Sequence, residues 1–396
     1  MLIYTDNAAT TRVSKTALDA MLPYLTEQYG NPSSLYGFAR KVSEDVEWAR
    51  ETVAGCLGAN YAREILFTSC GSESDNQALN SCAQLGARQG KKHLISTKFE
   101  HHAVLHTLRK LEKEGFEVTL LDVHDDGVVR IEDLAAAIRE DTCCVSVMFA
   151  NNEIGTIQPI AEIGALCREK GVVFHTDAVQ AAGHLPIDVE KMNIDMLSLS
   201  GHKFHAPKGV GALYVRKGIP LMSFIEGGAQ ERGKRAGTEN VAGIMALAAA
   251  LKESCDHMEA DAVKVTAMRD RLIAGLTQIP HSRMNGNMEH HVPGTVNLCF
   301  EGVSGEELLL LLDREGICAS SGSACASGSL DPSHVLLALG IPRELAYGSL
   351  RLSVGEYNTM DEVDHILAVV PKVVATLRAQ SPIWKKLEAG ERPHLC

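Results

Sequence analysis

The pattern of apolar and polar residues predicts a regular alternation of strands and helices from about residue 60 to 215. Short apolar runs predict strands at 65–68, 93–97, 118–121, 143–149, 172–176, 196–200 and 210–215. Between several of them, apolar residues recur every three or four positions and predict helices at 72–85, 103–114, 131–139 and 160–170. Such alternation predicts an α/β fold whose mainly parallel sheet is covered by helices on both faces.

The pattern differs on either side of this region. Before it, apolar residues spaced along 38–57 predict a long amphipathic helix that ends at Gly58. After about residue 250 we expect a long helix to roughly 278, strands at 295–300 and near 350–354, a helix at 305–315, and a short apolar element at 335–339 after a loop. Capping boxes predict that helices start after Ser304 and Thr359. This mixture of helices and strands is typical of a smaller α+β domain.

Composition narrows the class of protein. The chain has 396 residues with a formal net charge of -12 and no long basic run, which argues against a nucleic-acid partner. No apolar run has the roughly 18 residues that a membrane span needs, and the first residues do not resemble a secretory signal. Eleven cysteines without such a signal predict free thiols in a reducing compartment, so we expect a cytoplasmic protein.

One strand end resembles an anion-binding turn. After the strand at 65–68, Cys70 and Gly71 precede a helix for which we expect Ser72 as N-cap and Asp75 as its capping-box partner. An ordinary capped helix explains this pattern when it is taken alone. The alternative is a phosphate site, in which backbone amides and the helix dipole meet the anion and Gly71 lets it approach.

Two further strand ends carry residues of the kind that pyridoxal 5'-phosphate needs. Asp177 ends the strand at 172–176, and Lys203 follows the strand at 196–200. Alone, Asp177 could cap a helix and Lys203 could be a surface charge. With a phosphate site, however, they supply a carboxylate for the pyridinium nitrogen and an amine for a Schiff base. We therefore expect this cofactor at the carboxyl edge of the sheet.

Histidines at a fourth strand end allow two interpretations. His101 begins a helix after the strand at 93–97, where an imidazole can stack on a ring and move protons. His102 and His106 are spaced for one helical face and could bind a metal. We expect no metal there, because the sequence indicates no third ligand nearby.

Cys325 lies in a run of small residues, Ala319-Ser-Ser-Gly-Ser-Ala-Cys-Ala-Ser-Gly-Ser329. A flexible linker with an incidental cysteine is one interpretation. The other is a nucleophilic thiolate on a mobile loop, at about 316–333, that reaches a bound substrate and then moves away.

Blocks of sequence that run in order over nearly the whole chain resemble one enzyme family. They are Tyr4-Thr-Asp-Asn-Ala-Ala-Thr-Thr11, Gly30-Asn-Pro-Ser-Ser34, Thr68-Ser-Cys-Gly-Ser-Glu-Ser74, Glu100-His101, Asn151-Asn-Glu-Ile-Gly155, His175-Thr-Asp-Ala-Val-Gln180, Ser200-Gly-His-Lys203, Arg235-Ala-Gly-Thr-Glu-Asn240 and Ser320-Ser-Gly-Ser-Ala-Cys325. Together they resemble the class I cysteine desulfurases of the NifS/IscS type, which are pyridoxal-phosphate enzymes of the class-V aminotransferase family. The last block separates this type from the class II enzymes.

The resemblance implies a homodimer of fold type I, the aspartate aminotransferase architecture. It implies a large cofactor-binding domain at 12–250 and a small domain formed by 1–11 and 251–396, which carries the cysteine loop. By analogy, the cofactor contacts and the substrate contacts can be assigned to residues of this chain. The implied set is Lys203 for covalent attachment, Asp177 for the ring nitrogen, Gln180 for the ring hydroxyl, His101 for stacking and proton transfer, Gly71, Ser72, Ser200 and His202 for the phosphate, Thr238 for the partner subunit's cofactor, and Asn152 and Arg351 for cofactor and substrate carboxylate.

The implied reaction converts L-cysteine to L-alanine and leaves a persulfide on Cys325. The sulfur would then pass to an acceptor, such as a scaffold protein for iron-sulfur clusters, or would be used to make other thio-cofactors. The chain departs from many relatives at Leu35-Tyr36 and at Glu356, where changes in surface or loop contacts are expected. A selenocysteine lyase and an aminotransferase are the alternatives, because both would use the same lysine and aspartate.

Overall fold

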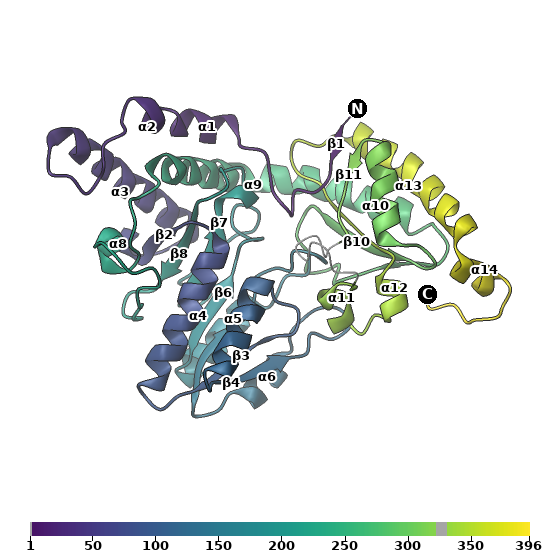
Figure 1. The fold of residues 1–396 in the computed structure, drawn as a ribbon, viewed down its shortest axis with the longest axis horizontal. Coiled ribbons are helices and arrows are strands. Elements are labelled where there is room, and N and C mark those ends of the chain that lie inside the picture. The colour runs from purple at the N-terminus through teal and green to yellow at the C-terminus, as the bar shows by residue number, and fades with distance from the viewer. Residues whose placement is uncertain (1, 322–330) are drawn as a thin grey trace.

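A seven-stranded, mainly parallel sheet forms one half of the molecule in this computed structural model, which describes residues 2–321 and 331–396. Its strands, in spatial order, are β2 (Ile65–Thr68), β8 (Gly211–Val215), β7 (Met196–Ser200), β6 (Val173–Asp177), β5 (Thr142–Ser146), β3 (His93–Thr97) and β4 (Glu117–Leu121). β8 runs antiparallel to both of its neighbours, and the other pairs are parallel (Figure 1). The predicted fold class is confirmed.

Alternate residues of the strands pack against helices on opposite faces of the large sheet, because neighbouring side chains of a strand point to opposite faces. Leu66 and Leu94 join a core with α4 (Gly71–Ala87) and α5 (His102–Lys113). Their neighbours Ile65 and Ile95 belong to a second core on the other face. That core also contains α3 (Gly37–Leu57), α6 (Ile131–Ala137), α7 (Ile160–Lys170) and the first part of α9 (Val241–Leu276).

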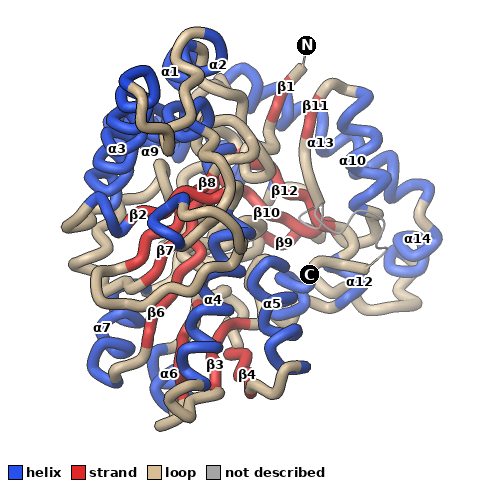
Figure 2. Tube along the Cα trace, turned by 60° about the vertical axis from the view of Figure 1, so that its left-hand side comes forward, coloured by secondary structure: helices blue, strands red, loops and turns tan. Residues whose placement is uncertain are grey.

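A smaller antiparallel sheet forms the other half of the molecule. Its spatial order is β12 (Ser349–Ser353), β10 (Thr295–Phe300) and β9 (Ser282–Met284). Its core includes the last part of α9 together with α10 (Gly305–Arg314) and α13 (Met360–Gln380). β1 (Ile3–Tyr4) lies in this half, where it pairs with β11 (Ile317–Cys318), a strand far along the chain (Figure 2). The proposed domain boundary at 250/251 falls inside α9.

Short elements complete the described chain. They are α1 (Lys15–Met21), α2 (Pro23–Thr26), η1 (Ala62–Glu64), η2 (Gly201–Lys203), α8 (Gln230–Gly233), α11 (His334–Ala338), α12 (Arg343–Ala346) and α14 (Pro382–Glu388). Among the described residues no single helix is long and apolar enough to cross a membrane, although α13 and α14, bent by 88°, reach that length and composition as a pair.

The start of α4 differs from the sequence expectation. The helix begins at Gly71, and its N-cap is Cys70, whose side chain makes no capping hydrogen bond. Ser72 is therefore already inside the first turn. Asp75 does not reach back to cap the helix; its side chain is buried against the sheet. Burial outweighed the local capping pattern, because the α4 face that carries Asp75 packs onto the central strands.

The glycine that ends α7 offers a test of backbone strain. Gly171 has a φ of 64°, and a Cβ added there would meet no atom within 4 Å. We expect Gly171→Ala to lower the free energy of unfolding by about 1 kcal/mol, because only the left-handed backbone opposes it. Gly55 inside α3 also has open space. The control Gly55→Ala should raise stability by about 0.5 kcal/mol. Equal effects of both variants in urea unfolding would refute this explanation.

Candidate active site

The carboxyl ends of the parallel strands bring the predicted residues to one edge of the large sheet. Asp177 is the last residue of β6, and Ser200 is the last residue of β7. Lys203 follows Ser200 within η2, and His101 lies between β3 and α5. Residues separated by about a hundred positions in sequence thus meet at this edge because their strands share a direction.

Asp177 is a buried carboxylate beside an amine. Its side chain is almost fully buried, and its Oδ1 accepts a hydrogen bond of 2.9 Å from the backbone N–H of Val179. Burial raises the pKa of Asp177 to about 6, while the positive charge of Lys203 acts to lower it. The carboxylate is therefore stabilised by any cation placed next to it, and the protonated nitrogen of a pyridinium ring is such a cation.

The segment before α1 holds the lysine and the glutamine. Lys203 Nζ donates hydrogen bonds to the carbonyl oxygens of Ala8 at 2.6 Å and Ala9 at 2.8 Å. Gln180 Nε2 donates to the same Ala8 oxygen at 2.9 Å. We call residues 5–11 the strap, because they pass from the small sheet to these side chains. The strap fixes the Lys203 amine at the edge of the sheet that carries Asp177.

His101 is held as a neutral imidazole. It is itself the N-cap of α5, and its Nδ1 accepts a hydrogen bond from the Ala103 N–H. Burial, followed by the charge of Lys203, lowers the pKa of His101 to about 4. The neighbouring Glu100 is fully buried, and burial raises its pKa to about 8. With Nδ1 accepting, the exchangeable proton of the neutral His101 ring is on Nε2.

The start of α4 has the features of a phosphate site. The amides of its first turn have no side-chain cap. A Cβ at Gly71 would lie 2.6 Å from Val179 Cγ2 and 3.4 Å from Ser200 Cβ, so only glycine allows this close approach. Burial lowers the pKa of His202 to about 4, which keeps that imidazole neutral as well. Uncapped amides and small residues fit an anion better than a neutral group.

Arg351 is buried between the two halves of the molecule. Its Nη1 donates to the backbone oxygen of Asn152 at 2.9 Å, and its Nη2 donates to Asp6 Oδ1 at 2.7 Å. Its Nε has no hydrogen-bond partner among the described residues. A buried guanidinium N–H without a partner is costly, which fits a site for a carboxylate ligand.

Cys325 lies outside the described residues, and so does the 322–330 part of the predicted mobile loop. The described residues before it pair with β12, because Ser320 and Arg351 exchange backbone hydrogen bonds of 3.1 and 2.6 Å. The residues after it contact the sheet edge: Ser333 donates to Glu153 Oε2, and His334 Nε2 donates to the Glu100 carbonyl oxygen. Both flanks of the 322–330 segment therefore lie next to proposed site residues.

Thr238 lies apart from the other proposed site residues. Thr238 is exposed on the loop before α9, and no described contact joins it to the other proposed residues.

The His334 ring centroid lies 4.6 Å from that of His102, and the His106 ring centroid lies 5.0 Å from that of His102. His334 is thus a third imidazole beside His102 and His106, whereas the sequence indicated no third ligand nearby. Within the described chain, these three do not form a group compact enough for a metal.

Glu356 lies closer to the lysine than the sequence suggested. Its Oε1 is 2.6 Å from Nε2 of His205, which is only two residues beyond Lys203. This contact raises the pKa of His205 despite its burial. His184 Nε2 donates to the Lys203 carbonyl oxygen at 2.9 Å. The departure at Glu356 therefore supports the turn that carries Lys203 and is not a surface change.

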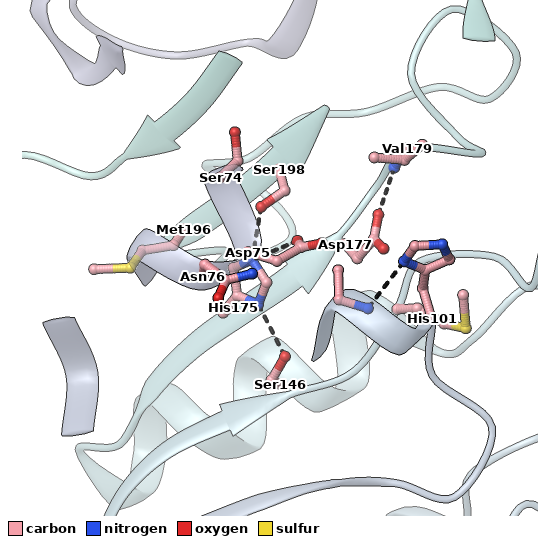
Figure 3. A network of polar contacts seen from close by, with 12 residues as sticks. Ser74, Asp75, Asn76, His101, Ser146, His175, Asp177, Val179, Met196 and Ser198 are labelled. Carbon is pink, nitrogen blue, oxygen red and sulfur yellow. Dashed lines mark hydrogen bonds and ion pairs between the residues drawn. The ribbon is translucent and has the colours of Figure 1, made fainter. Parts of the chain in front are cut away.

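A buried polar network under Asp177 was not predicted (Figure 3). His175 lies between the hydroxyl groups of Ser146 and Ser198, each 2.9 Å from one ring nitrogen. Asp75 Oδ1 is 3.6 Å from His175 Nε2. Burial lowers the pKa of His175 to about 3, which keeps this imidazole neutral near pH 7, and burial also raises the pKa of Asp75. Polar residues inside fully buried strands were the available signal for this network.

The network predicts a loss of stability in acid. The pKa of His175 is about 3 in the folded protein against an ordinary 6.5, so the unfolded chain binds more protons between these values. We expect this group to cost about 1.4 kcal/mol of unfolding free energy for each pH unit between about 6 and the folded-state pKa of about 3. His175→Gln keeps a polar side chain but does not titrate. Urea unfolding should show the wild-type stability falling more steeply with acid; parallel curves would contradict the neutral histidine.

Comparisons with known proteins agree with this geometry. The model of the aminotransferase class-V family matches residues 3–366. A cysteine desulfurase IscS of Clostridium botulinum is 53% identical over 386 residues, which are 97% of each chain. A solved NifS-like protein has a TM-score of 0.89 at 39% identity and covers 95% of this chain and 100% of its own. A solved structure of SspA in complex with cysteine has a TM-score of 0.78 at 37% identity, with coverages of 90% and 100%.

The buried acid, the strand-end lysine and the uncapped helix start fit pyridoxal 5'-phosphate, the cofactor of this family. The chain belongs to the aminotransferase class-V family, and within it to the pyridoxal-phosphate-dependent cysteine desulfurases.

Proposed function

We propose that this protein removes the sulfur of L-cysteine as a persulfide on Cys325 and releases L-alanine. The observation that carries the proposal is the buried Asp177 carboxylate beside the Lys203 amine at one sheet edge. The reaction balances without an external oxidant, because L-cysteine and one thiol give L-alanine and one persulfide. The structural relative SspA was solved in complex with cysteine, which supports the choice of substrate.

The cofactor residues follow from their positions. Lys203 would attach the cofactor, Asp177 would face its ring nitrogen, and Gln180 would contact its ring hydroxyl. Gly71, Ser72, Ser200 and His202 would hold the phosphate at the uncapped start of α4. When bound, pyridoxal phosphate supplies an electron sink for the substrate's α-carbon. Asp177 makes that sink stronger by keeping a proton on the ring nitrogen.

Arg351 and Asn152 would bind the substrate carboxylate. Arg351 is held by Asn152 O and Asp6, and its buried Nε stays available. A guanidinium that is fixed before the ligand arrives loses little side-chain entropy on binding. His101, neutral near pH 7 and carrying its proton on Nε2, would stack on the cofactor ring and assist proton transfer.

The Cys325 thiolate would attack the substrate sulfur, forming a sulfur–sulfur bond while the bond between carbon and sulfur breaks. The carbon keeps the bonding electron pair and takes up a proton, which gives L-alanine. The flanks of the 322–330 segment support this role, because Ser320 contacts Arg351 and His334 contacts Glu100.

Homodimer formation is part of the proposal. Exposed apolar side chains gather at the start of the chain, on α1, α2 and the residues before and at the start of α3; they are Leu18, Leu22, Leu25, Tyr29, Leu35, Tyr36 and Phe38. In such a dimer the exposed Thr238 would contact the partner's cofactor. The sulfur acceptor would be a scaffold protein for iron-sulfur clusters, and free thiols at all ten described cysteines suit a reducing cytoplasm.

The first test compares native protein with Cys325→Ser in the presence of L-cysteine and a reductant. We expect the native protein to release both alanine and sulfide, and the variant to keep its yellow cofactor but lose sulfide release. Cys318→Ser is the matched control, since this half-buried thiol lies on the same flank. If Cys325→Ser and native protein behave alike, Cys325 is not the nucleophile and a lyase or aminotransferase becomes the better assignment.

Asp177→Asn tests the proposed electron sink. The amide oxygen can still accept the Val179 N–H, so the variant should fold and retain cofactor. Without the carboxylate the ring nitrogen loses its protonated state, and we expect turnover to fall about 100-fold or more. The measurement is steady-state alanine release with cofactor content from absorbance. Near-normal kinetics in a fully loaded variant would refute the role of Asp177.

A further inference from the structure

A second cluster of metal-binding side chains lies in the small half of the molecule, away from the strand ends of the large sheet. It contains His281 before β9, Glu301 after β10 and His394 beyond α14. One ligand atom from each side chain lies within 4.8 Å of the other two. Glu301 Oε2 is 2.8 Å from His394 Nδ1 and 3.8 Å from His281 Nδ1. We call these three residues the His–Glu–His cluster.

Glu301 is a buried acid whose ion-pair partners are imidazoles. Its side chain is 4% exposed, and its Oε1 accepts a hydrogen bond of 2.7 Å from the Leu395 N–H. Among the described residues its carboxylate forms ion pairs with these two imidazoles and with no lysine or arginine, although the charge of Arg378 also acts on it. Burying a carboxylate is costly unless a positive charge or metal accompanies it.

Two of the three side chains are fixed in place independently of the third. The Glu301 N–H donates to the His281 carbonyl oxygen at 3.1 Å. The buried Arg378 donates to the carbonyl oxygens of Glu301 and His281, both at 3.0 Å. His281 also has a φ of 53°, a left-handed conformation that a residue other than glycine rarely adopts. This held backbone directs the imidazole toward Glu301.

The third side chain comes from a segment without regular structure. The His394 ring stacks on that of His281, with centroids 3.7 Å apart and planes 15° from parallel, so one ring must turn out of the stack before both Nδ1 atoms can face one ion. The Trp384 ring meets both imidazoles edge-on, at 5.5 and 5.8 Å. The Trp384 ring also packs on the Arg378 guanidinium at 4.0 Å. One side of the cluster is therefore closed by an aromatic wall.

We propose that the His–Glu–His cluster binds a divalent transition metal, with Zn²⁺ as the best-fitting ion. Two imidazole nitrogens and one carboxylate oxygen are a donor set that Zn²⁺ favours. Tetrahedral bonds of about 2.1 Å separate neighbouring ligand atoms by about 3.4 Å, which lies between the two measured distances. The metal replaces the Nδ1 protons that His394 now shares with Glu301 and that His281 shares with the Cys396 carbonyl oxygen.

The bound metal would fasten the chain after α14 to the end of β10. Arg392, Pro393 and Leu395 from this segment line a cavity of about 630 Å³, opposite Val303 and Tyr347. Because His394 lies between two of these residues, occupancy of the cluster would fix one wall of that cavity. The site would thus be structural, and it is independent of the proposed persulfide chemistry.

The test titrates the purified holoenzyme with Zn²⁺ against a chromophoric chelator. We expect native protein to bind one Zn²⁺ more per chain than His394→Ala, or to bind it at least about 100-fold more tightly. Glu301→Gln should show the same loss while still able to accept the Leu395 N–H. His124→Ala is the matched control, because His124 also pairs with a carboxylate, Asp133 at 3.0 Å, but has no third ligand among the described residues.

A second readout separates the cluster from thiols that bind zinc. The chain has two tryptophans, so in a Trp48→Phe background only Trp384 fluoresces. Co²⁺ should quench this emission in the otherwise native protein and leave it unchanged after His394→Ala. Equal Zn²⁺ stoichiometry and affinity in native protein, His394→Ala and His124→Ala would overturn the proposal and leave the cluster as a hydrogen-bonded contact only.

Discussion

The burial of one carboxylate governs the arrangement of this active site. Asp177 ends a strand whose other residues are buried, so its charge can be kept only with a cation nearby. Lys203, at the end of the adjacent strand, provides that charge through the fixed geometry of neighbouring parallel strands. The same burial would make the pyridinium nitrogen of a bound cofactor a favoured neighbour of Asp177, as proposed. Stability of the acid and chemistry of the cofactor therefore depend on one electrostatic contact.

The strap joins this centre to the small sheet. At one end Asp6 binds Arg351, and the Ala8 N–H donates to the Ser353 hydroxyl. At the other end Thr11 bonds to the His202 carbonyl oxygen, and Ala8 and Ala9 hold Lys203. The guanidinium proposed for the substrate carboxylate is thus connected through a few backbone contacts to Lys203, the lysine proposed to attach the cofactor. A shift of the small sheet would displace Lys203 through the strap, without a rearrangement of the core around the large sheet.

Neutral buried groups surround the charged pair. His101 and His175 have lowered pKa values and Glu100 has a raised one, each chiefly because of burial. Keeping these groups uncharged leaves Asp177 and Lys203 as the dominant charges at the strand ends. Glu301 in the small half, which is equally buried, forms ion pairs with two imidazoles and with no lysine or arginine of the described chain, and this difference makes it a metal-ligand candidate.

The sequence by itself determined the fold class and most strand and helix positions, while a resemblance to a known family supplied most of the residues proposed for the cofactor. It could do so because strand ends, glycine stops such as Gly171 and local caps such as Thr359 depend on near neighbours. The tertiary structure alone decided the position of Asp75, the network at His175, the link from Glu356 to His205 and the His–Glu–His cluster. These depend on packing between distant segments, and burial there outweighs the local preference that a sequence pattern records.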